Sequence, residues 1–330
     1  GGDSHNALNR PYYLRICNAR GIFIVMNLWK KKRVYLDSAA AAQVSRRALQ
    51  AFERASGVFA NPSSPHTEGR EAHDLLEVAR AQIATLAEVK ADAVIFTGTA
   101  TEANAIAIEG YVRALHTTSR AYADMHVLYA PGAHTSLVHT VEQLKSLGVS
   151  VEPLAYKQGE VDLEALAKQV NQNTVLVSVS AVCGETGAIT PMRDVRRVID
   201  SVRKIISTEI ILHVDASQLP RVGAFELTRL GADMLVLDAQ KVGGVRGVGA
   251  LVAPRRVKLS ALMHGGGQER LLRPGTPSPA LATAFTEALV EAHQTRAAFT
   301  AHSLTLRTQL LRDIGSISNI KVNEGKQQAP

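Results

Sequence analysis

The sequence predicts an α/β protein with a mainly parallel central sheet, helices on both faces, and the start of a smaller α+β domain. Short β-branched, apolar runs bounded by turn residues recur along the chain, and segments with helical periodicity separate them. Polar residues follow several of these runs directly. The chain has 330 residues, of which 46% are hydrophobic and 20% charged, so it can build a sizeable core in one large and one smaller domain.

The expected elements alternate along most of the chain. Strands are expected at 34–37, 93–96, 127–129, 149–154, 174–182, 210–215, 234–237 and 248–252. Helices are expected to end near residues 56 and 115 and to cover 75–87, 136–147, 163–170, 193–206 and 280–314. Strands that alternate with helices imply βαβ units, and therefore a sheet in which most neighbouring strands are parallel.

Residues 1–33 form a basic leader that differs from the rest of the chain. They contain seven Lys and Arg residues and one acidic residue, which accounts for +6 of the net charge of +7. Residues 34–330 are therefore nearly neutral, and bulk charge gives no reason to expect nucleic-acid binding. The apolar run from Ile22 to Met26 is too short to span a membrane. We interpret the leader as disordered or non-native sequence with Met26 as the true start; a transit-like peptide is the alternative.

Cysteine usage favours a reducing cytoplasm. The chain has two cysteines, Cys17 and Cys183, which are far apart and lack metal-ligand spacing. Neither a disulfide framework nor a zinc site is indicated. We therefore expect a cytoplasmic protein without a metal, in which Cys183 is a buried structural thiol.

The stretch from residue 210 to residue 241 carries the central chemistry. Asp215 ends one apolar run, and Lys241 lies just past the next. Side chains at the carboxyl ends of parallel strands line the ligand crevice of such sheets. A lysine and a carboxylate there suit pyridoxal 5'-phosphate (PLP), because the lysine forms the Schiff base and the carboxylate keeps the pyridine nitrogen protonated. A buried Asp–Lys ion pair, or two charges on surface loops, is the alternative.

Two earlier strands also lead into polar residues. The turn at 97–102 opens a helix, where free backbone N–H groups favour a phosphate and Thr101 adds a hydroxyl. An ordinary capped helix start is the alternative, and the missing glycine-rich dinucleotide and P-loop patterns disfavour nucleotide sites. His134 closes the next strand, where its imidazole could stack on an aromatic cofactor and transfer protons, or act only as a capping or loop histidine.

Two glycine-rich loops follow the lysine. Four glycines between residues 243 and 249 allow a sharp turn beside a ligand, or a plain hairpin between strands. The loop from Met263 to Thr276 could bind an anion or contact a partner subunit.

Together these motifs resemble the cysteine desulfurases of the class V aminotransferase group. The matching motifs occur in order, and they are Tyr35-Leu36-Asp37, Asn61-Pro62-Ser63-Ser64, Phe96-Thr97, Ala100-Thr101-Glu102, His134, Gly184-Glu185-Thr186-Gly187, His213 to Gln218, Lys241, and His264 to Thr276. The resemblance implies the PLP-dependent transferase fold type I. Residues 34–277 would form the PLP-binding large domain. Residues 278–330 would form a long helix and the beginning of a small α+β domain, against which 34–57 could pack.

The resemblance also implies a role for each matching residue around the cofactor ring. Lys241 would be the catalytic lysine that carries the cofactor and transfers a proton of the substrate. His134 would stack on the ring as the second catalytic residue. Asp215 would bind the pyridine nitrogen, and Gln218 would donate a hydrogen bond to the ring oxygen.

At the phosphate end, the resemblance implies contacts from two subunits. Ala100 through its backbone and Thr101 would bind the phosphate of their own site. Thr276 would reach the phosphate bound by the other subunit. The protein is therefore expected to be a homodimer with its sites at the interface.

Three positions depart from the family pattern. Gly184 stands where the family has an Asn that bonds the ring oxygen. Asp238 stands where a phosphate-binding Ser is expected, and a carboxylate there repels the phosphate unless it is turned away or paired. Gln240 replaces a His; its amide still donates a hydrogen bond to phosphate but carries no charge. These departures predict a divergent subgroup or weakened PLP binding.

The expected activity is conversion of L-cysteine to L-alanine, with sulfur retained as a persulfide for iron–sulfur cluster or thio-cofactor assembly. A sulfur-acceptor or scaffold protein is the expected partner. In the family, the persulfide-forming Cys and the Arg that binds the substrate carboxylate lie in the small domain, beyond the position of Pro330, so we expect the sequence to be incomplete. A related class V aminotransferase or lyase is one alternative. A non-catalytic PLP-binding partner in a sulfur-transfer complex is the other.

Overall fold

The computed structural model describes residues 34–330 except 119 and 158. The helices are α1 (Arg46–Ala55), α2 (Thr67–Ala87), α3 (Ala100–Thr118), α4 (Thr135–Gln143), α5 (Leu163–Gln169), α6 (Met192–Ile206), α7 (Leu227–Leu230) and α8 (Pro279–Ile314). The strands are β1 (Val94–Thr97), β2 (His126–Tyr129), β3 (Ser150–Pro153), β4 (Tyr156–Lys157), β5 (Glu160–Val161), β6 (Thr174–Ser180), β7 (Ile211–Asp215), β8 (Met234–Asp238) and β9 (Gly249–Val252). Predicted leader residues 1–33 lie outside the described part.

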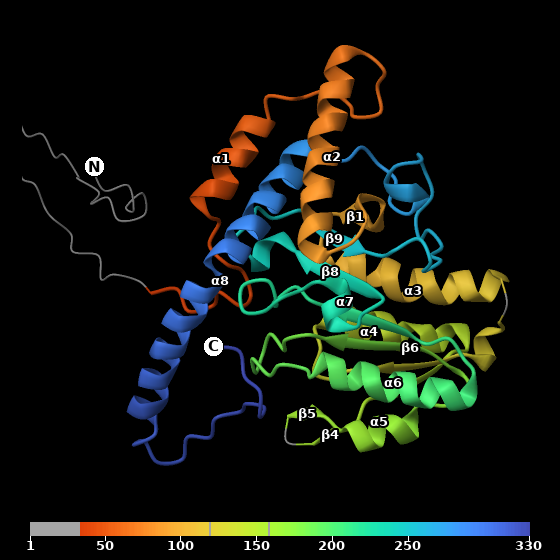
Figure 1. Ribbon diagram of the computed structural model, residues 1–330, viewed down its shortest axis with the longest axis vertical. Helices are drawn as coiled ribbons and strands as arrows, with labels where there is room; N and C mark the ends of the chain where they lie inside the picture. The colour runs from red at the N-terminus through yellow and green to blue at the C-terminus, as the bar shows by residue number, and fades with distance from the viewer. Residues whose placement is uncertain (1–33, 119, 158) are drawn as a thin grey trace, which may run out of the picture. The chain divides into compact units, whose positions relative to one another are not determined.

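Seven strands form the central sheet in the order β1-β9-β8-β7-β6-β2-β3 (Figure 1). The four pairs from β8 to β3 are parallel. Strand β9 is antiparallel to both of its neighbours, because the chain returns from β8 through a short loop instead of a crossover helix. The prediction of a mainly parallel sheet is confirmed, with β9 as the antiparallel exception.

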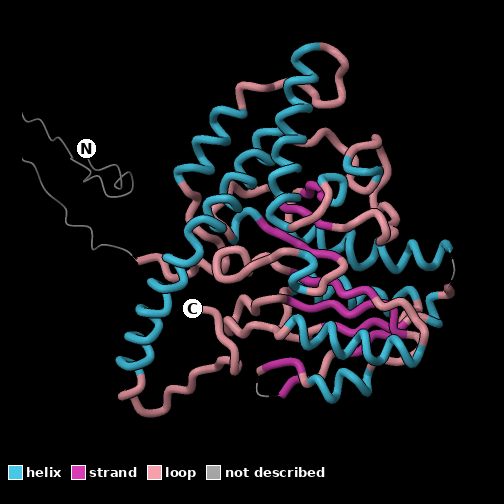
Figure 2. The backbone as a smooth tube through the Cα atoms, viewed as in Figure 1, coloured by secondary structure: helices cyan, strands magenta, loops and turns pink. Residues whose placement is uncertain are grey.

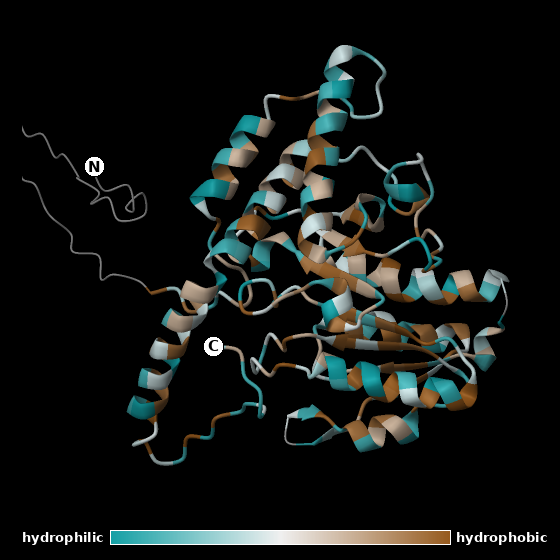
Figure 3. Cartoon of the chain, in the orientation of Figure 1, coloured by the Kyte–Doolittle hydropathy of each residue, from teal (hydrophilic) through white to brown (hydrophobic). Residues whose placement is uncertain are grey.

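Helices cover both faces of the sheet (Figure 2). Along β7, Leu212 and Val214 join a core with α2, α6 and α8, whereas Ile211 joins a second core with α3 and α4. This alternation follows from the two-residue period of a strand. Because both faces are covered, β7 and β8 are buried along their whole length, and the apolar side chains concentrate on the sheet (Figure 3).

Two expectations about local structure need correction. Residues 34–37 form no strand; the side chains of Val34 and Leu36 are 74% and 89% exposed, so no buried face orders them into one. The predicted helix at 136–147 ends at Gln143 and continues as a 3₁₀ turn through Leu147. The small β4–β5 hairpin was not predicted, because two-residue strands carry too little periodicity.

The long helix α8 packs on α1 and α2 through its first half, where Ala282, Phe285 and Leu289 are buried. The described residues from Ser38 onward cluster into one compact unit. A domain boundary near residue 277 stays a prediction. No helix in the described ranges is long and apolar enough to cross a membrane.

Candidate active site

Eight of the nine predicted site residues line one cavity of about 470 Å³ at the carboxyl edge of the parallel strands. They are Ala100, Thr101, His134, Asp215, Gln218, Asp238, Gln240 and Lys241. Asp215 and Asp238 end β7 and β8, and His134 follows β2 after a four-residue loop. Parallel strands present their carboxyl ends at one edge, so residues more than 100 positions apart in the sequence meet there.

Lys241 ends the 3₁₀ turn that follows β8, and its side chain is half-buried. Its Nζ donates hydrogen bonds of 2.9 and 2.8 Å to the carbonyl oxygens of Ala39 and Ala40. The amine is therefore directed to backbone carbonyls, whereas the alternative interpretation paired it with Asp215. Gln218 Nε2 donates to the same Ala39 oxygen at 2.8 Å, so one carbonyl orders both side chains.

Asp215 is buried, and both of its carboxylate oxygens accept hydrogen bonds. Oδ1 accepts from the backbone N–H of Ser217 at 3.0 Å, and Oδ2 accepts from Asn104 Nδ2 at 3.0 Å. Asn104 is completely buried within α3 and also donates to Ser136 Oγ at 2.9 Å. The carboxylate thus keeps a fixed orientation, since its partners belong to its own loop and to a packed helix.

His134 is the N-cap residue of α4, so the capping alternative is confirmed while the ring also lines the cavity. Its Nδ1 accepts from the backbone N–H of Ser136 at 3.1 Å and lies 2.8 Å from Ser136 Oγ. An acceptor Nδ1 places the proton of the neutral ring on Nε2. Asn104 and Ser136 therefore connect His134 to Asp215 through hydrogen bonds.

The start of α3 lines one end of the cavity. The backbone N–H of Ala100 points toward Asp238 Oδ2 at 3.4 Å, and Asp238 Oδ1 accepts from the backbone N–H of Gln240 at 2.9 Å. Burial raises the pKa of Asp238, and the hydrogen bonds from these N–H groups act against that shift. The carboxylate at the position where the resemblance implies a phosphate-binding Ser is therefore buried in the wall of the cavity.

Gly184 lines the same cavity as Gln218. A Cβ at this position would lie 3.3 Å from Gln218 Nε2, so the side chains of residues 184 and 218 compete for the same space. Gln218 keeps its amide at this side of the cavity. Glycine at 184 provides no side-chain donor, so the amide of Gln218 is the polar side-chain group at this part of the cavity.

Thr276 does not line this cavity. It contributes to a separate cavity of about 400 Å³ with Phe52, Phe59 and Pro277. The same loop is tied to the start of α3 by the ion pair between Arg273 and Glu102, at 3.0 Å. Thr276 therefore lies outside the site of its own chain.

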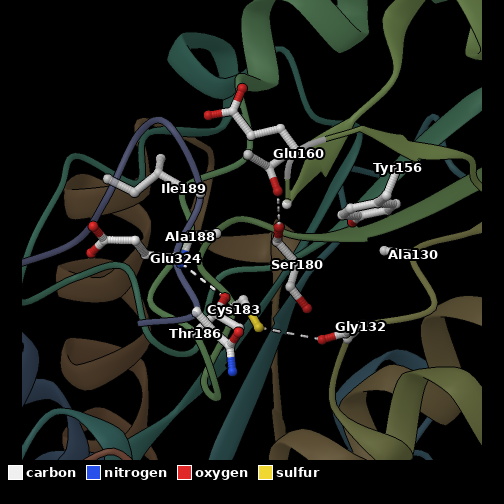
Figure 4. A pocket seen from close by; sticks show the side chains of 15 residues that line it. Ala130, Gly132, Tyr156, Glu160, Ser180, Cys183, Thr186, Ala188, Ile189 and Glu324 are labelled. Carbon is white, nitrogen blue, oxygen red and sulfur yellow. Dashed lines mark hydrogen bonds between the residues drawn. The ribbon is translucent and has the colours of Figure 1, made fainter. Parts of the chain in front are cut away.

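A smaller cavity of about 320 Å³ adjoins the site and shares Gly132 and Ser180 with it (Figure 4). Cys183 lines this cavity, and its thiol points to the carbonyl oxygen of Gly132 at 3.5 Å. The prediction of a buried thiol is wrong, because Cys183 lies in a loop and is only half-buried. Tyr156 lines the same cavity and is 41% exposed.

Three contributors to the site were missed in the sequence. Asn104 is polar within the otherwise apolar stretch from Ala103 to Ile108, which could have marked it. Ser217 lines the cavity with a buried Oγ that has no hydrogen-bond partner among the described residues. The carbonyl oxygens of Ala39 and Ala40 have no side-chain signature at all. In the described ranges, no group of three or more His, Cys, Asp or Glu side chains could hold a metal ion.

Comparison with known proteins places these motifs in a family. The aminotransferase class-V family profile matches residues 34–330. The cysteine desulfurase IscS of Buchnera aphidicola is 33% identical over 308 residues, an alignment that covers 91% of this chain and 74% of that protein. The mitochondrial cysteine desulfurase of Candida maltosa is 31% identical over 302 residues, covering 90% of this chain and 60% of that protein.

Solved structures give the same result for the fold. A NifS-like protein superimposes with a TM-score of 0.85 at 29% identity, covering 91% of this chain and 80% of that chain. SspA in complex with cysteine superimposes with a TM-score of 0.71 at 29% identity, covering 78% of this chain and 72% of that chain. The predicted fold class is therefore confirmed by structures of similar architecture.

Proposed function

The chain belongs to the aminotransferase class-V family, as a relative of its cysteine desulfurases, and we propose on this basis that it is a PLP-dependent enzyme that removes sulfur from L-cysteine. The observation that carries the proposal is the convergence of Asp215, Lys241 and His134 on one cavity at the carboxyl edge of the sheet. A direct Asp215–Lys241 ion pair would have favoured a structural role. Lys241 instead bonds two backbone carbonyls, which leaves the Asp215 carboxylate for a ligand.

The residues at the ring end of the cavity fit PLP. Asp215 would bind the ring nitrogen through a carboxylate that Asn104 and Ser217 hold in place. His134 would cover one face of the ring, and Gln218 would donate to its oxygen. Ser217 Oγ, buried and without a hydrogen-bond partner in the described part of the chain, provides a further polar group in this wall.

The residues at the phosphate end of the cavity fit PLP on the condition that Asp238 is protonated. Ala100 and Thr101 lie at the start of a 19-residue helix, where backbone N–H groups and the helix dipole favour an anion. Asp238 already accepts from the N–H of Ala100, and as a carboxylate it would repel a phosphate. A protonated Asp238 would donate a hydrogen bond to the phosphate instead.

PLP supplies, when bound, an electron sink for negative charge at the α-carbon of an amino acid. Lys241 would hold the cofactor and, as a free amine, take and return the α-proton of the substrate. The carbonyl oxygens of Ala39 and Ala40 would hold the ammonium form that results. His134, with its proton on Nε2, would act toward the substrate as a hydrogen-bond donor rather than a base.

The proposed enzyme acts in a sulfur-transfer complex within the cytoplasm. L-cysteine is the proposed substrate, and a sulfur-acceptor or scaffold protein for iron–sulfur cluster assembly is the proposed partner. Cys183 directs its thiol to the carbonyl of Gly132, so we assign the persulfide to a different cysteine. A homodimer in which Thr276 reaches the site of the other subunit is consistent with its position outside the cavity of its own chain.

Two measurements test the proposal. Purified protein supplied with PLP should show the visible absorbance band of a lysine-bound cofactor, and Lys241→Ala should lose it, whereas the exposed-lysine control Lys258→Ala should keep it. Supplied with L-cysteine, a thiol reductant and a sulfur-acceptor protein that carries the persulfide cysteine, the protein should release alanine and sulfide in equal amounts. A band retained in Lys241→Ala would refute the lysine assignment. Loss of the amino group without sulfide would favour a related aminotransferase, sulfide without alanine would favour a lyase, and a band without turnover would favour a non-catalytic binding partner.

A further inference from the structure

Asp238 lies at the α3 end of the cavity, where two backbone N–H groups hold its carboxylate in position. Its Oδ1 is held by the N–H of Gln240 at 2.9 Å, and its Oδ2 lies 3.4 Å from the N–H of Ala100. The side chain is only 7% exposed. Both partners are uncharged backbone groups, so neither neutralises the carboxylate.

The sheet register explains why Asp238 lies against the start of α3. Asp238 pairs with Gly249 of β9, and Gly249 packs against the turn at Thr99 and Ala100. A Cβ on Gly249 would lie 2.8 Å from the carbonyl carbon of Thr99, closer than real side chains approach. The glycine therefore lets the helix start approach β9, and Asp238 cannot withdraw without disturbing the pairing of β8 and β9.

Of the charged groups that the structure describes around Asp238, one is a cation, Lys241. Lys241 lies on the turn that follows β8, and it lowers the pKa of Asp238 less than burial raises it. Asp215 on β7 raises that pKa further. His134 and Glu185 line the cavity from their loops. On α3 the nearest acid is Glu102, but its carboxylate is bound to Arg273 and to the N–H of Gly98.

We propose that Asp238 couples phosphate binding to proton uptake, so that the phosphate of the cofactor enters the α3 end of the cavity together with one proton on Asp238. The proton then lies between Asp238 and a phosphate oxygen, with the carboxylic acid as donor. The N–H of Ala100 becomes available to the phosphate when Asp238 loses its charge. This inference rests on the proposed PLP function and makes Asp238 a determinant of cofactor affinity.

The test measures dissociation constants of PLP between pH 6 and pH 9 for the full chain and for Asp238→Asn. The amide of the variant donates a hydrogen bond as the protonated acid does, but it cannot lose a proton. Above the pKa of Asp238, each rise of one pH unit should lower the PLP affinity of the wild-type protein about tenfold more than that of the variant. Throughout the range above that pKa, the variant should bind PLP more tightly than the wild-type protein.

Pyridoxal, which has the same ring and aldehyde but no phosphate, is the matched probe. Its affinity should be the same for the wild-type protein and for Asp238→Asn at each pH. Calorimetry in buffers of different ionisation enthalpy should show one more proton taken up with PLP by the wild-type protein than by the variant. Asp238→Ser is a second neutral variant, so a folding defect of one substitution does not decide the result.

Parallel pH profiles for the wild-type protein and both variants would overturn the coupling, and so would an equal change in pyridoxal affinity. In either case a Lys241-dependent absorbance band would leave the proposed function intact. If neither the wild-type protein nor either variant binds PLP at any pH, the cofactor assignment fails and the coupling fails with it.

Discussion

Asn104 Nδ2 lies 3.0 Å from Asp215 Oδ2, although 111 residues separate them in the sequence. The other hydrogen of the same amide nitrogen goes to Ser136 Oγ, which in turn contacts His134 Nδ1. One buried amide thus orients both groups that would contact the ring of the cofactor. Within the described part of the chain, its Oδ1 has no hydrogen-bond partner, so the side chain is held there through its donors.

Replacing Asn104 should weaken the site as well as the fold. Asn104→Ala leaves Asp215 Oδ2 without its donor, and burial makes such a loss cost about 1–3 kcal/mol in the free energy of unfolding. Because the Asp215 carboxylate then loses its fixed orientation, PLP should bind more weakly and the pH midpoint of the visible band should move. Spectral titration of the PLP-loaded protein measures both effects.

Thr286→Val supplies the matched control for Asn104. Thr286 is also buried in a helix, but it bonds Ala79 and Ala282 far from the site cavity. This variant should lose a similar amount of stability and keep the spectral midpoint of the wild-type protein. If Asn104→Ala also kept that midpoint, Asn104 would have a purely structural role.

His213 should make the fold sensitive to acid. The ring is completely buried and bonds Ser178, and burial lowers its pKa from 6.5 to about 4. The unfolded chain takes up a proton below pH 6.5, whereas the folded chain does so only near pH 4. The stability that His213 contributes is therefore present above pH 6.5 and is lost as the pH falls toward 4, by up to about 3 kcal/mol.

Denaturant unfolding at several pH values measures this loss. His213→Phe cannot take up the proton, so its stability should fall less steeply between pH 6.5 and 4 than that of the wild-type protein. The exposed His264 provides the control, since His264→Gln should follow the wild-type profile. Equal slopes for the wild-type protein and His213→Phe would contradict the assignment.

The buried ion pair between Arg80 and Glu269 should anchor the loop from Met263 to Thr276. Glu269 accepts two hydrogen bonds from the guanidinium, at 2.7 and 2.8 Å, and a third from the backbone N–H of Phe96 at 2.7 Å. Glu269→Leu removes the buried partner of Arg80 and leaves it only the half-exposed carboxylate of Glu77, so the free energy of unfolding should fall by up to about 3–5 kcal/mol. Thermal and denaturant unfolding measure this cost.

The double variant Arg80→Met with Glu269→Leu distinguishes the contribution of the ion pair to stability from the contribution of the packing around it. Removing both charges leaves no unpaired buried ion, so the double variant should be more stable than Glu269→Leu alone. Additive losses from the two single substitutions would show that the ion pair contributes nothing beyond its separate side chains.

Much of the fold could be predicted because each strand carries its own signal. The apolar runs that became β7 and β8 are buried on both faces, and such runs are recognisable without knowledge of their partners. Val34 to Asp37 has a similar composition but does not form a strand. Only the tertiary structure supplies neighbours and a buried face, so a short apolar segment is ambiguous until they are known.

The candidate site was likewise predictable from the sequence only in part. The sequence by itself determined that Asp215 ends a strand and that Lys241 and His134 each follow one, and the parallel arrangement then brings all three to one edge of the sheet. Only the tertiary structure decided the contacts that depend on register and helix packing: Asn104 against Asp215, and Asp238 against the N–H of Ala100. Local periodicity specifies which face a side chain occupies. It does not specify the distance between side chains of elements that meet only when the chain folds.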